Sequence, residues 1–478
     1  MPKTRPYLYY DTAQSLCSTC FRKVDGKIVF QEEKVFLLKR CPEHGGEKVL
    51  LSDDVAYYRR CREVFLKPPE MPLQYQTKVE HGCPYDCGLC PDHEQHACLA
   101  LVEVTDHCNL KCPVCYAGSG PERPGFLSLT EVEARLDAVV RAEGTADVVQ
   151  LSGGEPTIHP DFFAILDAAK ARPIRHLMVN SNGVRLAADR EFVQRLAKYQ
   201  PGFEIYLQFD SLHEAPLRAL RGADLRKTRK RALEHLNEFD ISTTLVVTLK
   251  KGLNDGEIGE ILEFALTQPC VRGVTFQPIQ DAGRNEDYDP ARDRLTLSEV
   301  RRAIYTQCPR FKPEDILPVP CHPDHLAMAY ALKLDGKVVP LTGLIDPQVL
   351  IDGGRNTIVY EKEPAIQKEL FKLFSLNHAP ESAAGSLKEL LCCLPKLALP
   401  SALSYRNLFR IIIMEFMDAR SLDIRAVKKA CVMIATGDGR LIPFDTYNLF
   451  YRDNLEAERL GPLRAMQQAK MQLPVIGG

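Results

Sequence analysis

The sequence predicts an α/β fold built around an open, partial (β/α)6 barrel. Between about residues 99 and 290, short runs of aliphatic residues alternate with longer segments of helical periodicity. Strand and helix follow each other about six times, which favours parallel strands joined by right-handed crossovers. Six units are too few for a closed eightfold barrel, so we expect the barrel to stay open.

The individual elements of this barrel are read from its apolar runs. The expected strands are 99–105, 147–153, 176–183, 204–211, 243–249 and 271–279. The expected helices are 129–144, 160–171, 189–199, 225–239 and 256–268. At the first helix we expect Thr130 and Glu133 to form a capping box.

The rest of the chain divides into three regions around the barrel, 99–290. Residues 1–75 are cysteine-rich and contain short expected strands such as 26–30 and 34–40. Residues 76–98 hold a further cysteine cluster and lead into the barrel. Residues 291–478 are expected to form a mixed C-terminal region that contributes to a substrate or auxiliary site.

Composition excludes several classes of protein. The 478 residues include 61 basic and 63 acidic side chains, so no overall positive charge indicates nucleic-acid binding. The sequence shows no secretory signal and no run of 18 apolar residues, and we expect a cytoplasmic protein. Eleven of the 17 cysteines precede residue 116. Since disulfides are rare in reducing compartments, this clustering indicates metal binding.

Three cysteines follow the first expected strand with the spacing C-x3-C-x2-C: Cys108, Cys112 and Cys115. In a β/α barrel, reactive groups gather on loops at the carboxyl ends of the strands. Three thiolates on one loop can hold three irons of a [4Fe–4S] cluster and leave the fourth iron open to an outside ligand. A zinc knuckle is the alternative for this loop.

This spacing on the first loop of a partial β/α barrel resembles the radical S-adenosylmethionine (radical SAM) superfamily. The resemblance implies that SAM chelates the open iron and is reductively cleaved to a 5′-deoxyadenosyl radical, which abstracts hydrogen from unactivated carbon. One departure is mild: the residue before the third cysteine, often aromatic in the family, is Val114, and Tyr116 follows the cysteine.

The other strand ends carry the residues that the family uses to bind SAM. Gly153 and Gly154 permit close backbone approach, and Glu155 offers a carboxylate to the SAM ammonium. The resemblance implies that the polar residues at the strand ends hold the ribose and methionine portions of SAM and that Gln277 lies near its adenine. The expected SAM-binding residues are Tyr116, Gly153, Gly154, Glu155, Pro156, Asn180, Asn182, Gln208, Asp210 and Gln277.

Two further metal sites are expected before the barrel. Cys83, Cys87, Cys90 and Cys98 match the ligation of a second [4Fe–4S] cluster, which would transfer electrons or stabilise structure; zinc is the alternative. The pairs Cys17/Cys20 and Cys41/His44 form two knuckles that predict a mononuclear zinc or rubredoxin-like iron site. Cys61 is the alternative to His44 as its fourth ligand.

The whole chain is similar to one radical SAM branch, which includes the archaeal tetraether lipid synthase and pterin-methylating enzymes. In those relatives a cysteine replaces Asp445, and a further cysteine lies near His325. A third [4Fe–4S] cluster, for which Cys321, Cys392, Cys393 and Cys431 are available, is therefore left open, with Asp445 or a histidine as an unusual ligand.

Two segments have both a structural and a functional interpretation. The apolar stretch 385–417 is expected to form a buried helical core, or else a wall for a long alkyl substrate. The basic helix near Arg226 and Lys230 is expected to be a solvated face, or else to meet lipid headgroups or an acidic electron donor.

These observations favour a radical SAM enzyme that forms carbon–carbon bonds on lipid alkyl chains. Methylation or another modification of a pterin-like small molecule is the alternative, followed by peptide modification and, last, an iron–sulfur sensor. The expected partners are a small-molecule or lipid substrate and a ferredoxin- or flavodoxin-like electron donor. We expect no nucleic acid. A peripheral contact with a membrane is left open, through the apolar stretch 385–417 or the basic helix near Arg226.

Overall fold

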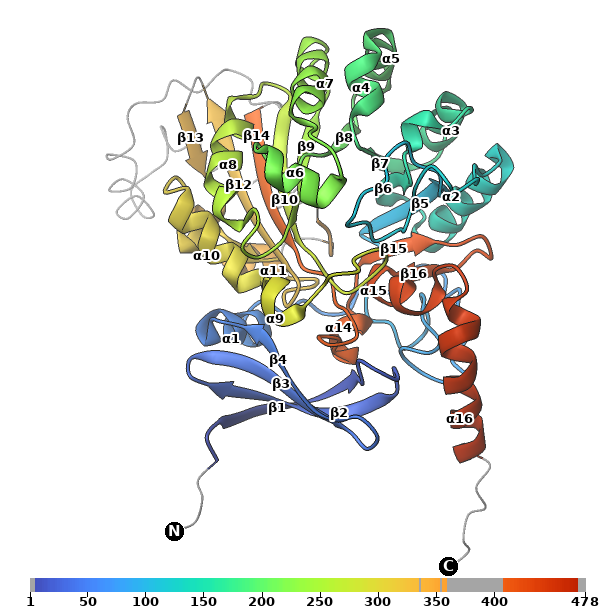
Figure 1. Cartoon of the computed structure of the whole chain (residues 1–478), viewed down its shortest axis with the longest axis vertical. Coiled ribbons are helices and arrows are strands. Elements are labelled where there is room, and N and C mark those ends of the chain that lie inside the picture. Colours follow the sequence, from blue (N-terminus) through green and yellow to red (C-terminus); the bar gives the residue numbers. More distant parts are fainter. Residues whose placement is uncertain (1–4, 335–336, 353–354, 359–406, 472–478) are drawn as a thin grey trace, which may run out of the picture.

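The computed structural model describes residues 5–334, 337–352, 355–358 and 407–471. Its strands form two sheets, a four-stranded antiparallel sheet at the N-terminus and a twelve-stranded mixed sheet. Figure 1 shows the small sheet beneath the large one, with the helices of the barrel on the outer side of the large sheet.

The N-terminal sheet has the simple order β1-β2-β3-β4. Its strands are β1 Leu8–Leu16, β2 Lys23–Gln31, β3 Lys34–Cys41 and β4 Gly45–Ser52. Alternate side chains such as Ile28, Val35 and Leu37 turn inward and form a small core with Tyr58 of α1 (Val55–Glu63). The strands expected at 26–30 and 34–40 are confirmed as parts of β2 and β3.

Six parallel strands form the centre of the large sheet. They are β5 Leu99–Thr105, β6 Ala146–Gly153, β7 Ile174–Ser181, β8 Phe203–Gln208, β9 Thr243–Leu249 and β10 Val271–Pro278. The covering helices are α2 Leu129–Glu143, α3 Phe162–Lys170, α4 Val184–Ala188, α5 Arg190–Leu196, α6 Glu214–Arg221, α7 Arg226–Glu238 and α8 Ile258–Thr267. The six expected strands and five expected helices are confirmed; the short helices α4 and α6 are additional.

The start of α2 differs from the expected one. Ser128, in extended conformation, is the N-cap and forms the capping box with Glu131. The expected pair of Thr130 and Glu133 is wrong because Thr130 already lies inside the helix, where its side chain cannot reach the free N–H groups of the first turn.

The C-terminal residues widen the barrel sheet at both edges. Strand β14 pairs with β10 and β15 pairs with β5, both in parallel, while β12 and β16 add antiparallel neighbours. These strands are β11 Leu317–Pro318, β12 Leu326–Leu334, β13 Lys337–Pro340, β14 Leu408–Met414, β15 Val432–Ala435 and β16 Leu441–Pro443. The sheet runs from β11 to β16 without its ends pairing, so the barrel is open as expected.

The apolar stretch 385–417 falls partly outside the described residues, which resume at 407. Its described part is the buried strand β14, so the helical interpretation is wrong there. Three consecutive isoleucines, Ile411 to Ile413, favour a strand because β-branched side chains fit a pleated, buried surface.

Several helices connect or follow the outer strands: α9 Pro290–Asp293, α10 Leu297–Gln307, α11 Pro347–Asp352, α14 Ile424–Lys428, α15 Phe444–Thr446 and α16 Gly461–Met471. None of the helices in the described part of the chain is long and apolar enough to cross a membrane.

Candidate functional site

The loop after β5 carries Cys108, Cys112 and Cys115 at the mouth of the barrel. Arg284, which follows β10, fixes this loop from the opposite side. Its backbone pairs with Cys115 in both directions, at 3.0 and 2.9 Å, and its guanidinium donates to the carbonyl oxygens of Cys112 and Ser119, both at 2.6 Å. The loop that presents the thiols is therefore held at several points before any metal binds.

Gly153 and Gly154 bring the end of β6 against the same loop. A Cβ atom on Gly153 would lie 2.1 Å from the Thr105 carbonyl oxygen, and one on Gly154 would lie 2.0 Å from that of His107. The close approach allows Gly154 N to donate to Thr105 O at 2.7 Å and Glu155 N to donate to His107 O at 2.9 Å. Residues with side chains would force the two segments apart.

Glu155 connects the ends of β6 and β7. Its carboxylate is 1 % exposed and accepts hydrogen bonds from Thr157 N, Thr157 Oγ1, Ser181 Oγ and Asn182 N. Burial raises the pKa of Glu155, and these donors act in the opposite direction. The carboxylate therefore has a structural role in the chain itself; its expected contact with the SAM ammonium stays a prediction.

A chain of hydrogen bonds crosses the strand ends from the cluster loop to α6. Ser152 Oγ lies 3.1 Å from Tyr116 OH and accepts from Asn180 Nδ2 at 3.3 Å. Asn180 Oδ1 accepts from Gln208 Nε2 at 2.8 Å, and Gln208 Oε1 accepts from Arg221 Nη2 at 3.0 Å. The polar strand ends predicted from sequence thus form one connected belt around the mouth.

Arg221, the last residue of α6, is the cation of this belt. It donates two hydrogen bonds to the buried carboxylate of Asp210 and lies beside Cys112. Burial alone would lower the pKa of Arg221, but Asp210 raises it above its usual value. Burial raises the pKa of Cys112, and the fixed positive charge of Arg221 opposes this rise and favours the thiolate.

One cavity at the barrel mouth brings most of the predicted residues together. It is lined by Cys108, Cys112, Cys115, Tyr116, Gly153, Gly154, Glu155, Asn180, Asn182, Gln208 and Gln277. Two predicted residues do not line it. Pro156 begins a buried 3-10 turn (Pro156–Ile158), and Asp210 lies behind Arg221, which it orients.

These residues fit an iron–sulfur cluster with SAM beside it. The loop offers three thiols, and Asn182 Nδ2 lies 3.8 Å and Leu110 N 3.4 Å from the sulfur of Cys108. The three sulfurs do not fall within 4.8 Å of one another, which suits a multi-iron cluster better than a single ion. The cavity also holds the cation, amides and carboxylate that a zwitterionic nucleoside requires.

Three residues of this site were not predicted from sequence. Arg221 and Arg284 lie outside the strand-end motifs, on a helix end and in a later loop, so only the fold reveals them. Ser152 directly precedes Gly153, and the alternation of β6 was a usable signal, because it places Ser152 on the same inward face as Gln150.

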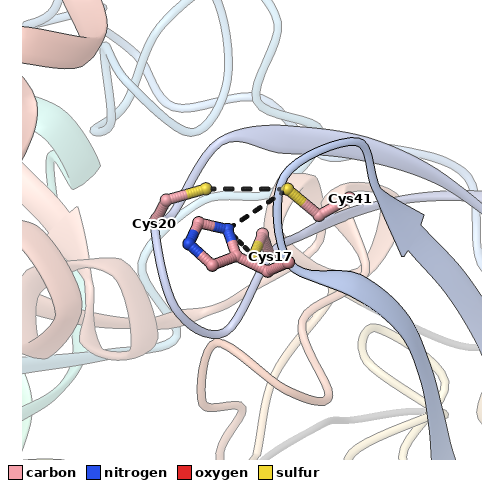
Figure 2. A group of neighbouring side chains, drawn as sticks. Cys17, Cys20 and Cys41 are labelled. Carbon is pink, nitrogen blue, oxygen red and sulfur yellow. Dashed lines mark hydrogen bonds between the residues drawn. The ribbon is translucent and has the colours of Figure 1, made fainter.

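The N-terminal sheet holds a compact metal-binding group. The ligand atoms of Cys17, Cys20, Cys41 and His44 all lie within 4.8 Å of one another (Figure 2). The sulfurs of Cys20 and Cys41 are 3.8 Å apart, close to the spacing of two thiolates on one tetrahedral zinc with bonds of about 2.3 Å. Cys61, the alternative ligand, faces the core from α1 and is not in this group.

Cys98 does not join the cysteines that precede it. Its sulfur lies within 4.8 Å of those of Cys321 and Cys431, in a fully buried group. The reason is register: β5 pairs with β15 so that Leu99 is opposite Val432, which places Cys98 beside Cys431. The expectation that Cys98 joins Cys83, Cys87 and Cys90 in one metal site is therefore corrected: Cys98 lies with Cys321 and Cys431 instead.

The other three cysteines of that set stay near one another in the loop before β5. Cys83 and Cys87 are in hydrogen-bond contact, with Cys90 beside Cys87. Thr446 Oγ1 lies 2.9 Å from the sulfur of Cys87. Asp445 accepts a hydrogen bond from Met417 N and belongs to neither metal-binding group of the described residues; Cys392 and Cys393 lie outside those residues.

Comparison with known proteins identifies both metal-binding parts. The model of the radical SAM superfamily matches residues 102–265, and that of the HMPTM N-terminal zinc ribbon domain matches residues 9–53. The zinc ribbon model covers all four residues of the N-terminal group, so further metal binding beside the SAM cluster is supported.

One relative and two solved structures match parts of the chain. The chain is 30% identical to the GTP 3′,8-cyclase of Synechococcus elongatus over 42% of this chain and 60% of the cyclase. Streptococcus suis SuiB bound to its precursor peptide SuiA gives a TM-score of 0.38 at 15% identity, over 57% of this chain and 65% of SuiB. A radical SAM methyltransferase from Sphaerobacter thermophilus gives 0.32 at 13%, over 63% and 75%. Both scores are too low to support a conclusion about this chain.

One relative matches along almost the whole length. The chain is 30% identical to the 7,8-dihydro-6-hydroxymethylpterin dimethyltransferase of Methanocaldococcus jannaschii, over 94% of this chain and 95% of that protein. With the cysteine loop, the SAM cavity and the zinc ribbon in place, this chain belongs to the radical SAM superfamily and, within it, to the family of that protein.

Proposed function

We propose that this chain is a radical SAM methyltransferase that acts on a pterin-like heterocycle. The observation that carries the proposal is the full-length relationship to the pterin dimethyltransferase, which includes the zinc ribbon and the C-terminal strands as well as the barrel. Lipid chain coupling, which the sequence favoured, has no such support among the comparisons.

The cavity has apolar walls, and a few amide groups within them favour a polar heterocycle over an alkyl chain. Carboxamides of Gln150, Asn180, Gln208, Gln277 and Gln280 reach the cavity wall. Asn180, Gln208 and Gln277 already have hydrogen-bond partners, whereas the carboxamide of Gln150 and Oε1 of Gln280 have none in the described part of the chain. A buried polar group left without a partner costs about 1–3 kcal/mol, and an alkyl chain offers no hydrogen bond. A pterin has ring nitrogens, an amino group and a carbonyl group with which such amides can pair.

Cys108, Cys112 and Cys115 would hold the SAM-binding cluster. When bound, the cluster supplies the electron that cleaves SAM, and the resulting 5′-deoxyadenosyl radical removes a hydrogen atom from a substrate carbon. In the overall reaction a C–H bond of the heterocycle would be replaced by a C–CH3 bond, and the hydrogen would leave in 5′-deoxyadenosine. With a second SAM as the methyl donor, its S–CH3 bond breaks and S-adenosylhomocysteine leaves. Each methyl group then consumes two electrons from the reduced electron donor, one to cleave the first SAM and one to complete the transfer.

We also propose that the loop of Cys83, Cys87 and Cys90 holds a metal cluster that passes electrons inward. Thr446 contacts Cys87, and Phe444, two residues earlier, packs edge-on against Tyr116 with ring centroids 5.0 Å apart. Tyr116 directly follows Cys115, so a short packed path joins the two loops. Cys98, Cys321 and Cys431 would bind a further metal centre. A ferredoxin- or flavodoxin-like protein stays the expected electron donor.

The test is turnover with the relative's substrate. Anaerobically reconstituted protein with dithionite and SAM is incubated with 7,8-dihydro-6-hydroxymethylpterin, and products are identified by mass spectrometry. We expect 5′-deoxyadenosine and a pterin heavier by one or two methylene units. The variant with Cys108, Cys112 and Cys115 all changed to alanine should form neither. If wild-type protein forms 5′-deoxyadenosine but leaves the pterin unchanged, the proposed substrate class is wrong.

A further inference from the structure

Next to the cavity at the barrel mouth, the interior of the barrel has a smaller hollow. This second, deeper hollow is lined by residues that come earlier on the same strands, such as Val148, Met178 and Thr244. Both hollows share four lining residues: Leu99, Gln150, Tyr206 and Met414. These four residues form the boundary between the expected SAM site and the barrel interior.

Gln150 is the unusual residue of this boundary. It lies on β6 two positions before Ser152, on the same inward face, and about 7 Å further from the end of the strand. The whole residue is only 4 % exposed. In the part of the chain that the structure describes, its carboxamide makes no hydrogen bond, although it borders both hollows.

The neighbouring polar groups already have partners. The hydroxyl of Tyr206 accepts from Gln277 Nε2 at 3.1 Å and lies near Thr275. Nearer the mouth, Gln208 and Asn180 bond to each other. The carboxamide of Gln150 is not among the fully enclosed unpaired groups of the described residues, so it is open to the hollows that it lines. The fold gives no structural reason for a glutamine between the buried residues Val149 and Leu151.

The surroundings of Gln150 indicate what it binds. A carboxamide presents an N–H donor beside a carbonyl acceptor, which is complementary to the N–H/C=O edge of a pyrimidinone ring. Leu99, Met414 and the ring of Tyr206 supply apolar walls for a flat bicycle. We propose that Gln150 binds the N–H/C=O edge of the heterocyclic substrate and thereby selects it, an inference that rests on the proposed function.

This placement also orients the substrate. With its amide edge on Gln150, the ring points its opposite, substituted side toward the mouth, where Cys108 and the SAM-binding residues lie. The carbon atoms on that side are then the ones within reach of a radical generated there. The amide edge, which is the most polar part of the ring, remains deepest in the barrel.

The inference is tested by binding rather than by turnover. Fluorescence titration with 6-hydroxymethylpterin, with SAM present and clusters reconstituted, gives the Kd for wild type, Gln150→Leu and Gln150→Met. We expect both variants to bind at least tenfold more weakly, with SAM affinity unchanged. Gln194→Leu, at an exposed position on α5, is the matched control and should bind as wild type does. Gln150→Met keeps the length of the side chain and serves if Gln150→Leu does not fold.

A methylated ligand separates a direct contact from a structural effect. Pterin methylated at the ring N–H of the amide edge should bind at least tenfold more weakly to wild type but lose little further affinity in Gln150→Leu. Equal losses in both proteins, or unchanged pterin binding by the variants, would overturn the inference while leaving the proposed function intact. Loss of SAM affinity by the same factor would assign Gln150 to the cofactor instead. A wild-type protein that binds no pterin would overturn the proposed function itself.

Discussion

Replacing Glu155 by glutamine should loosen the connection between the ends of β6 and β7. The carboxylate accepts from Thr157 N at 3.2 Å, from Ser181 Oγ at 2.9 Å and from Asn182 N at 2.7 Å. A carboxamide of the same shape has one accepting oxygen instead of two. Its NH2 group must therefore face the N–H of Thr157 or of Asn182, donor against donor.

The size of the effect follows from that mismatch. One buried backbone N–H loses its acceptor, which costs about 1–3 kcal/mol, while the neutral amide avoids the burial of a charge. A net loss of about 2 kcal/mol in the free energy of unfolding lowers the melting temperature by roughly 4–8 °C for a domain of about 150–250 residues, the size range of the barrel. Calorimetry on wild type and Glu155→Gln measures this change in melting temperature. Glu131→Gln is the matched control, because Glu131 is an exposed capping-box residue that glutamine can replace.

The same variants separate two roles for Glu155. If its carboxylate only bound the SAM ammonium, Glu155→Gln would weaken SAM binding and leave the melting temperature within a degree of wild type. That result would refute the conclusion that the hydrogen bonds of Glu155 hold the ends of β6 and β7 together. We expect instead a loss of stability in the absence of SAM, because the four hydrogen bonds lie within the chain.

At the zinc ribbon, Cys41→Ser should release the bound metal, whereas His44→Cys should retain it, as metal analysis by mass spectrometry would show. Cys98→Ala and Cys321→Ala should lower the bound metal by equal amounts because their sulfurs share one group, and unequal losses would contradict this. Burial raises the pKa of Asp445 from 3.8 to about 7, so the folded state binds a proton that the unfolded state releases. The contribution of this carboxyl group to stability therefore falls as pH rises between these values. Urea unfolding of Asp445→Asn and wild type over this range should show it as a stability difference that changes with pH in favour of the variant as pH rises.

The sequence was sufficient for the barrel because its signals are local. Each parallel strand is buried on both faces and reads as a short apolar run, and each covering helix has its own amphipathic period. The cysteine loop and the glycines after β6 are equally local, since a few adjacent residues define each. The addition of β14 and β15 to the sheet was not predictable in this way, because nothing within those short runs specifies their neighbours.

Cys98 shows the limit for the metal sites. In sequence it follows Cys90 closely enough to look like the fourth member of one motif. In the fold, the pairing of Leu99 with Val432 brings it to Cys431, more than 300 residues away. Spacing predicts ligands that share one loop, as for Cys17 and Cys20, but it fails when a strand begins between them and carries the later residue elsewhere.

A different kind of signal is present at Gln150. The run Val148 to Leu151 is otherwise apolar, and packing in a strand buried on both faces does not require a carboxamide. Packing alone would favour valine or leucine there. A polar residue that packing does not explain and that no neighbour pairs with is explained most simply by a ligand. The residues that bind the cofactor can be recognised from a motif, whereas the residue that selects the substrate is recognised because it breaks the apolar pattern of its strand.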